Sequence, residues 1–164
     1  FDFLSSAREE YRDEEEAVVV KGNVTKIYPL RTLRVHEAIN DVSAGTPILV
    51  VNCFLADLVT VYDRRYCGKA LTFGVSGWTY FDEDIHNSLE SFILWDRDTE
   101  SLWWPITNRG VSGDFKQVSM NKLNSEQWEI LTFKEIDDLY SQARVLRRGQ
   151  KVNVNSLPNF TGCN

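Results

Sequence analysis

The length and composition of the chain limit what it can be. It has 164 residues, of which 43% are hydrophobic and 12% aromatic, enough to bury the core of one domain. Its net charge of -6, from 18 basic and 24 acidic residues, argues against a nucleic-acid-binding protein that relies on clustered Lys and Arg. No apolar run approaches the roughly 20 residues that a membrane-spanning helix needs, so we expect a soluble protein, with peripheral membrane association left open. Because the chain begins at Phe1 instead of Met, we expect it to be processed or to lack its true start.

The first sixteen residues, 1–16, predict an acidic arm or a short helix. Phe1, Phe3 and Leu4 form an apolar cluster, and a dense run of charged residues follows them. The acidic run 13–16 is most simply a solvated face. An arm with an exposed apolar end often docks on a neighbour, so Phe1 and Phe3 are candidate interaction residues.

Residues 17–148 have the pattern of a single β-rich domain. The first part, AVVVKGNVTKIYPL, combines a β-branched run, a Gly-Asn turn and a second extended segment. The next segment, LRTLRVHEAIND, has apolar residues near helical spacing and predicts a short helix. ILVVNCFLA is a continuous apolar run between turn residues, and its short length favours a buried central strand over a buried helix.

Two tandem hairpins are predicted between residues 58 and 104. The segment from Leu58 to Gly77 alternates apolar and polar residues on both sides of a tight link, Arg65-Tyr-Cys-Gly68. The segment SFILWDRDTESLWWP repeats this pattern. Two such hairpins make an antiparallel β meander, either sandwich-like or an open barrel, and residues 116–120 alternate like an edge strand.

The segment LTFKEIDDLYSQA predicts an amphipathic helix. Thr132 can cap its N-terminus, and Glu135, three residues later, completes the sequence of a capping box. Residues 149–164, rich in Gly, Asn and Ser, predict an extended or poorly ordered tail. The expected fold class is therefore α+β, mainly β, with an antiparallel meander and a few short helices.

His36 and Cys53 are the pair of side chains that could bind a metal ion. Imidazole and thiolate suit zinc, copper or iron, and Glu37, Asp41 or Asp57 could complete the site. The competing interpretation is structural: a histidine bonded to a backbone carbonyl, and a small buried thiol.

The remaining polar motifs do not match the metal-binding or catalytic patterns that they partly resemble. His86 follows the acidic residues of FDEDIH, a loop without the glycine and the twelve-residue spacing of an EF-hand, so a solvated loop is expected. Ser76, in GVSG, does not fit the G-x-S-x-G nucleophile elbow. No catalytic residue is predicted.

Aromatic side chains gather in the predicted meander. Trp103 and Trp104 are adjacent on one strand, so their side chains must point to opposite faces of the sheet. Either a helix packs over the second face, or that face binds a partner or a ligand. Trp78, Trp103 and Trp104 are therefore candidate interaction residues.

The cysteines and sequons bear on the compartment. Cys53, Cys67 and Cys163 are too few for a disulfide framework but allow one bridge and one free thiol. Asn23 and Asn159 begin N-x-Thr sequons and are candidate glycosylation sites. These features lean toward an extracytoplasmic protein, secreted or in an organelle lumen.

Five motifs in order, covering about residues 17–148, resemble the domain of unknown function 3179 family. They are Tyr28-Pro-Leu-Arg31, Val35-His-Glu-Ala-Ile-Asn-Asp41, Tyr62-Asp-Arg-Arg65, Leu71-Thr-Phe-Gly-Val-Ser-Gly77 and Trp95-Asp-Arg-Asp-Thr-Glu-Ser-Leu-Trp103.

The resemblance implies a Cys/His centre that is degraded in this chain. His36 matches the family's histidine, and Cys53 matches the first cysteine of its C-P-L-C motif, a constellation that looks like a metal or thiol-redox centre. This chain has Ala56 where the second cysteine belongs, and Val35 and Asn52 replace the Trp and Tyr that precede the two matched residues. Alanine can neither bind a metal nor resolve a disulfide.

A family scaffold with a degraded site points to a noncatalytic accessory or structural subunit, or a protein-interaction module, of a larger assembly. Other protein subunits are the expected partners, and no cofactor is expected. One alternative is a metal-dependent or thiol-redox protein that uses His36 and Cys53 with one transition-metal ion. The second alternative is a carbohydrate- or ligand-binding β module.

Overall fold

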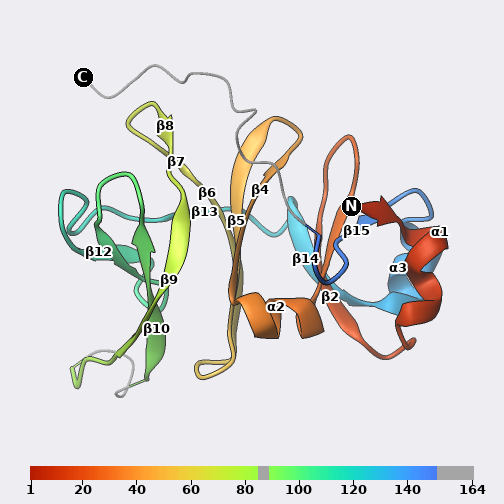
Figure 1. The fold of residues 1–164 in the computed structure, drawn as a ribbon, viewed down its shortest axis with the longest axis horizontal. Coiled ribbons are helices and arrows are strands. Elements are labelled where there is room, and N and C mark those ends of the chain that lie inside the picture. The colour runs from red at the N-terminus through yellow and green to blue at the C-terminus, as the bar shows by residue number, and fades with distance from the viewer. Residues whose placement is uncertain (85–88, 151–164) are drawn as a thin grey trace.

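The three larger β-sheets of the described residues stand side by side, and two short helices cover the outer face of one end sheet (Figure 1). The structure is a computed structural model that describes residues 1–84 and 89–150. The expected α+β, mainly β class with antiparallel sheets and short helices is confirmed. The sheets stack as in a sandwich and do not close into a barrel within the described residues.

The terminal sheet contains both ends of the described chain. Its order is β1 (Asp2–Phe3), β15 (Arg144–Val145), β3 (Lys26–Pro29), β2 (Glu16–Val20) and β14 (Trp128–Thr132). On β2, Ala17 and Val19 pack against α1 (Leu4–Ala7) and α3 (Phe133–Leu139), whereas Val18 and Val20 pack toward the neighbouring sheet. The two extended segments predicted on either side of the Gly-Asn turn are confirmed as β2 and β3, which pair with each other, and the apolar run of β2 reflects burial of both faces.

Residues 1–16 pack against this terminal sheet. β1 pairs with β15, and α1 is followed by a 3-10 turn over Arg8–Glu10. The side chains of Leu4, Ala7 and Tyr11 are buried, and the Tyr11 ring stacks on Phe133 with centroids 4.2 Å apart. The Phe1 ring meets the edge of Tyr28, so the apolar end of the segment docks on its own domain.

The central sheet has the order β13 (Asn121–Lys122), β6 (Leu58–Asp63), β5 (Thr46–Cys53) and β4 (Ala38–Ser43). Ile48 and Val50 of β5 pack toward the terminal sheet, and Leu49, Val51 and Cys53 pack toward the opposite side. This confirms the predicted buried central strand. α2 (Leu30–His36) leads into β4, so the expected helix ends at His36, and the rest of its segment is a strand.

The distal sheet is a meander of β9 (Phe73–Tyr80), β10 (Ser91–Asp96), β11 (Leu102–Trp104) and β12 (Arg109–Ser112). Its inner face shares an apolar core with the central sheet. Its outer face points away from the rest of the protein (Figure 1). Within the described residues, no helix is long and apolar enough to cross a membrane.

The hairpin predicted for residues 58–77 is wrong. β6 pairs with β5 and β13, whereas β9 pairs with β10 in another sheet. The link forms its own small hairpin of β7 (Arg65–Tyr66) and β8 (Lys69–Ala70). The physical reason is that β6 places Val61 and Tyr62 in two different cores and needs cover on both faces, which only the central sheet provides.

The edge strand predicted at residues 116–120 is also absent. This segment makes only isolated bridges from Lys116 and Ser119 to β12. Residues 113–119 form a loop that lies beside β12, the edge strand of the distal sheet.

Candidate functional site

The polar residues of the sequence motifs lie at joints between the sheets. The Asn40 amide donates from Nδ2 to the Phe73 carbonyl (2.7 Å), and its Oδ1 accepts from the Phe73 backbone N–H (2.8 Å). One side chain thus satisfies both backbone groups of a residue in another sheet. It joins β4 of the central sheet to β9 of the distal sheet.

Asp41 joins the central sheet to the terminal sheet. Its buried carboxylate accepts hydrogen bonds from the Tyr28 hydroxyl (2.6 Å) and from Lys26 Nζ (2.7 Å). Burial and the nearby Asp41 charge hold the pKa of the Tyr28 phenol well above its ordinary value, so the phenol stays a hydrogen-bond donor.

Arg64 is fully buried, at 0% exposure, and binds only backbone carbonyls. Its guanidinium donates to the oxygens of Ile48 (2.8 Å), Asp41 (3.1 Å) and Leu71. Burial lowers its pKa to about 10, which leaves the group charged at neutral pH. Arg64 therefore clamps three backbone segments together.

Asp96 closes the turn between β10 and β11. It accepts hydrogen bonds from Trp103 Nε1 (2.8 Å), from the Thr99 backbone N–H (2.7 Å) and from the Thr99 hydroxyl. The carboxylate is fully buried. These polar motif residues are therefore used in holding the scaffold together.

His36 and Cys53 lie on neighbouring backbone segments but in different surroundings. The carbonyl of Glu37 accepts a hydrogen bond from the Asn52 backbone N–H (2.8 Å), which brings the end of α2 beside the end of β5. The His36 side chain is exposed, whereas Cys53 is 0% exposed in the apolar core between the central and distal sheets. Ala56 packs against that same core.

No group of three or more His, Cys, Asp or Glu residues that could hold a metal ion occurs within the described part of the chain. Glu37 directly follows His36 at the end of α2. Its backbone φ is positive, at 56°, which is strained for a residue with a side chain. Burial raises the pKa of its carboxyl. Metal binding by His36 and Cys53 stays a prediction.

The cysteines, the sequon asparagines and His86 lie in different parts of the chain. Cys53 is a free thiol, and Cys67 is disulfide-bonded. Asn23 is exposed in the turn between β2 and β3. His86, Asn159 and Cys163 lie outside the described residues.

The two adjacent tryptophans point to opposite faces of the distal sheet, as predicted. Trp103 is buried in the inner core, and Trp104 lies on the outer face. The Trp104 ring is covered by the Tyr80 ring, which meets it edge-on at 4.9 Å, so the cover is an aromatic side chain of β9 and not the helix considered from the sequence. Of the predicted interaction residues, Trp103 and Trp104 are therefore buried, Phe1 is half-buried, and Phe3 and Trp78 are exposed.

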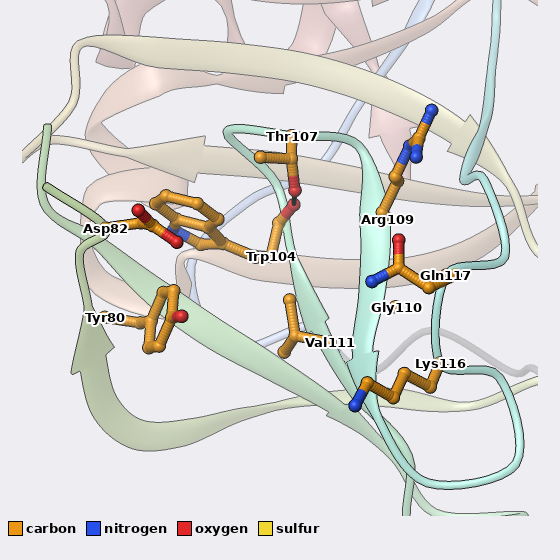
Figure 2. A pocket seen from close by; sticks show the side chains of 9 residues that line it. All are labelled: Tyr80, Asp82, Trp104, Thr107, Arg109, Gly110, Val111, Lys116 and Gln117. Atoms are coloured by element: carbon orange, nitrogen blue, oxygen red, sulfur yellow. Dashed lines mark hydrogen bonds between the residues drawn. The ribbon is translucent and has the colours of Figure 1, made fainter. Parts of the chain in front are cut away.

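The outer face of the distal sheet contains a cavity of about 470 Å³ beside Trp104. Figure 2 shows Asp82, Tyr80 and Trp104 on one side of it and Arg109, Gln117 and Lys116 on the other. The lining residues are Tyr80, Asp82, Trp104, Thr107, Arg109, Gly110, Val111, Lys116 and Gln117.

The 113–119 loop brings Lys116 and Gln117 to the cavity because Gly110 has no side chain. The Gln117 backbone N–H donates to the Gly110 carbonyl (2.8 Å), and the Gly110 N–H donates to the Val118 carbonyl (2.9 Å). A Cβ at Gly110 would lie 2.0 Å from the Phe115 carbonyl oxygen, so any other residue would push the loop away. The Phe115 ring anchors the loop against Trp103.

Three side chains of the cavity, Trp104, Arg109 and Lys116, have donors without partners within the described residues. The Nε1 atom of Trp104 is buried, and its N–H donates no hydrogen bond within the described residues. Arg109 and Lys116 are exposed, and neither side chain makes a hydrogen bond or ion pair in the described part of the chain. The cavity therefore offers two cations to a ligand, and the indole N–H lies beneath its surface.

A second, smaller hollow of about 190 Å³ lies on the same outer face. It is lined by Ser76, Trp78, Trp95, Glu100 and Leu102, and the Trp78 side chain is 69% exposed. Together, the two hollows make this aromatic face the candidate functional site.

The sequence pattern does not reveal the cationic side of the site. Arg109, Lys116 and Gln117 lie in a segment that reads as a polar connection, and nothing local shows that they converge on Trp104. The available signal was limited to a cation next to a glycine, Arg109-Gly110, in the segment that follows the aromatic strand β11.

A family model described as "Protein of unknown function (DUF3179)" matches residues 1–155. No curated protein and no solved structure matches the chain.

Proposed function

Because the chain belongs to the DUF3179 family of proteins of unknown function, we propose that it is a noncatalytic interaction module that binds a protein partner through the outer face of the distal sheet. The observation that carries the proposal is a group of exposed aromatic side chains at the end of β9. Trp78 is 69% exposed, Phe81 53% and Tyr80 41%. Exposed aromatic groups of this size are typical of protein interfaces.

The use of the polar motif residues supports the same proposal. The polar groups of the motif residues form hydrogen bonds with the backbone and side chains of the fold, as seen at Asn40, Asp41, Arg64 and Asp96. These contacts hold the fold together, so the motif residues have a structural role that does not require catalysis. The partner surface should be apolar, with polar groups at its rim.

The proposed setting is a larger assembly outside the cytoplasm, in a secreted form or in an organelle lumen. The exposed Asn23 sequon is accessible to a glycosyltransferase, and a disulfide at Cys67 would persist in an oxidising compartment.

The test is capture of the partner at native abundance with matched aromatic variants. Wild type should retain a stoichiometric protein partner, and Trp78→Ala combined with Phe81→Ala should lose it. Phe54→Ala is the control, because Phe54 is also exposed (60%) but lies in the turn between β5 and β6. The proposal fails if the double variant retains the partner, or if Phe54→Ala loses it as well.

The alternative is a metalloprotein that uses His36 and Cys53. The backbone contact between Glu37 and Asn52, which brings the two segments together, favours it. Metal analysis of the purified protein separates the two functions: a stoichiometric transition metal that is lost in both His36→Ala and Cys53→Ala would favour the metalloprotein.

A further inference from the structure

We propose that the cavity beside Trp104 binds an acidic sugar, a pyranose ring that carries a carboxylate. This small-molecule site goes beyond the proposed function, and of the exposed aromatic side chains of the partner surface it uses only Tyr80. It depends on the unpartnered donors of the cavity, on its charge pattern and on its aromatic wall.

The indole N–H of Trp104 requires an acceptor. Indole nitrogen can only donate, and Trp104 Nε1 is buried without a partner among the described residues. A buried donor without a partner costs about 1–3 kcal/mol, so such groups are rare in native proteins and call for an explanation. The atom has less than 1 Å² of accessible surface, so an oxygen atom of a ligand in the cavity reaches this N–H only after the side chains that cover it move.

The charges on the opposite wall select an acid. Arg109 and Lys116 converge on the cavity from β12 and the 113–119 loop, although the chain carries a net charge of -6 (Figure 2). Neither cation has a side-chain partner in the described residues. A guanidinium and an ammonium together form charge-assisted hydrogen bonds with a carboxylate, and the Gln117 amide adds a neutral donor.

The remaining wall suits the hydroxyl groups and the apolar face of a sugar ring. The Asp82 carboxylate can accept hydrogen bonds from hydroxyl groups. The Tyr80 ring stands edge-on to Trp104 and is 41% exposed, so it offers an aromatic surface to the C–H face of a pyranose. The volume of about 470 Å³ is within the usual range of small-molecule sites.

The experiment compares three probes that separate the ring from the charge. D-glucuronate carries both, D-glucose has the same ring with a hydroxymethyl group in place of the carboxylate, and acetate has the carboxylate alone. Titration of the purified chain by saturation-transfer NMR or calorimetry should give saturable binding of glucuronate, with glucose and acetate weaker by about tenfold or more.

Charge-neutralising variants locate the site. Arg109→Gln and Lys116→Gln should each weaken glucuronate binding by about tenfold and leave the weak binding of glucose unchanged. Both positions are exposed, so the variants should fold, and thermal melting checks this. Lys134→Gln is the control, because Lys134 is exposed on α3 at the opposite end of the protein and should not change binding.

Several results would overturn the inference. If glucose bound as tightly as glucuronate, the carboxylate would not contribute to binding. If acetate bound as tightly as glucuronate, the sugar ring would not contribute. Tighter binding of glutamate, titrated as a fourth probe, would assign the site to an amino acid, and an absence of glucuronate binding would leave no sugar site. Partner capture by Arg109→Gln is expected to match wild type, so failure here is distinguishable from failure of the proposed function.

Discussion

Single buried polar residues carry much of the fold. Arg64 illustrates this when it is compared with Arg97. Both follow an aspartate, in similar Tyr-Asp-Arg and Trp-Asp-Arg segments. Arg64 is enclosed and binds three carbonyls, whereas Arg97 is exposed. The same dipeptide therefore has two different structural roles.

Replacing Arg64 by lysine should lower the free energy of unfolding by about 2–4 kcal/mol. Lysine keeps the charge but lacks the planar fork, so at least one of the three carbonyls loses its donor inside the core. Chemical denaturation measures the change. Arg97→Lys is the matched control and should stay within about 0.5 kcal/mol of wild type, and equal effects of the two variants would contradict this role of Arg64.

At the scale of elements, α3 is the helix whose start is predicted most directly by its local sequence. The capping box is present as expected: the Thr132 hydroxyl accepts from the Glu135 N–H (3.3 Å), and the Glu135 carboxylate accepts from the Thr132 N–H (2.8 Å). The hydrogen bonds from Thr132 lower the pKa of the Glu135 carboxyl, which keeps this acceptor ionised.

Thr132→Ala should destabilise the protein by about 1 kcal/mol, because one N–H of the first turn of α3 loses its acceptor. The Glu135→Ala variant removes the reciprocal bond. In a double-mutant cycle measured by denaturation, the two costs should sum to more than the cost of the double variant, since both belong to one motif. Strictly additive costs would show that the two residues act independently.

At the scale of the whole molecule, few polar contacts connect the sheets. Asn40 links the central sheet to the distal sheet, and Asp41, its neighbour, links the central sheet to the terminal sheet. Because side chains alternate along a strand, two adjacent residues on β4 reach in opposite directions.

Asn40→Ala should loosen the distal sheet selectively. The variant leaves the N–H and carbonyl of Phe73 without partners, at a cost of about 2 kcal/mol. Hydrogen exchange should become faster in β9 and β10, while β2 and β3 of the terminal sheet keep the rate of wild type. Uniformly faster exchange across all three sheets would indicate global destabilisation instead.

The sequence by itself determined the elements whose signals are local. The hairpin of β2 and β3, the buried strand β5 and the cap of α3 each follow from periodicity, burial on both faces or a four-residue motif. It also placed Trp103 and Trp104 on opposite faces, because alternation along a strand depends only on backbone geometry.

Only the tertiary structure decided which strands became neighbours. β6 and β9 flank one tight turn, yet they belong to different sheets, because β6 has two apolar faces to cover. In the same way, Trp104, Arg109 and Lys116 share a cavity only once the 113–119 loop pairs along the edge of β12. Pairing and convergence depend on contacts between residues distant in sequence, and these have no local signal.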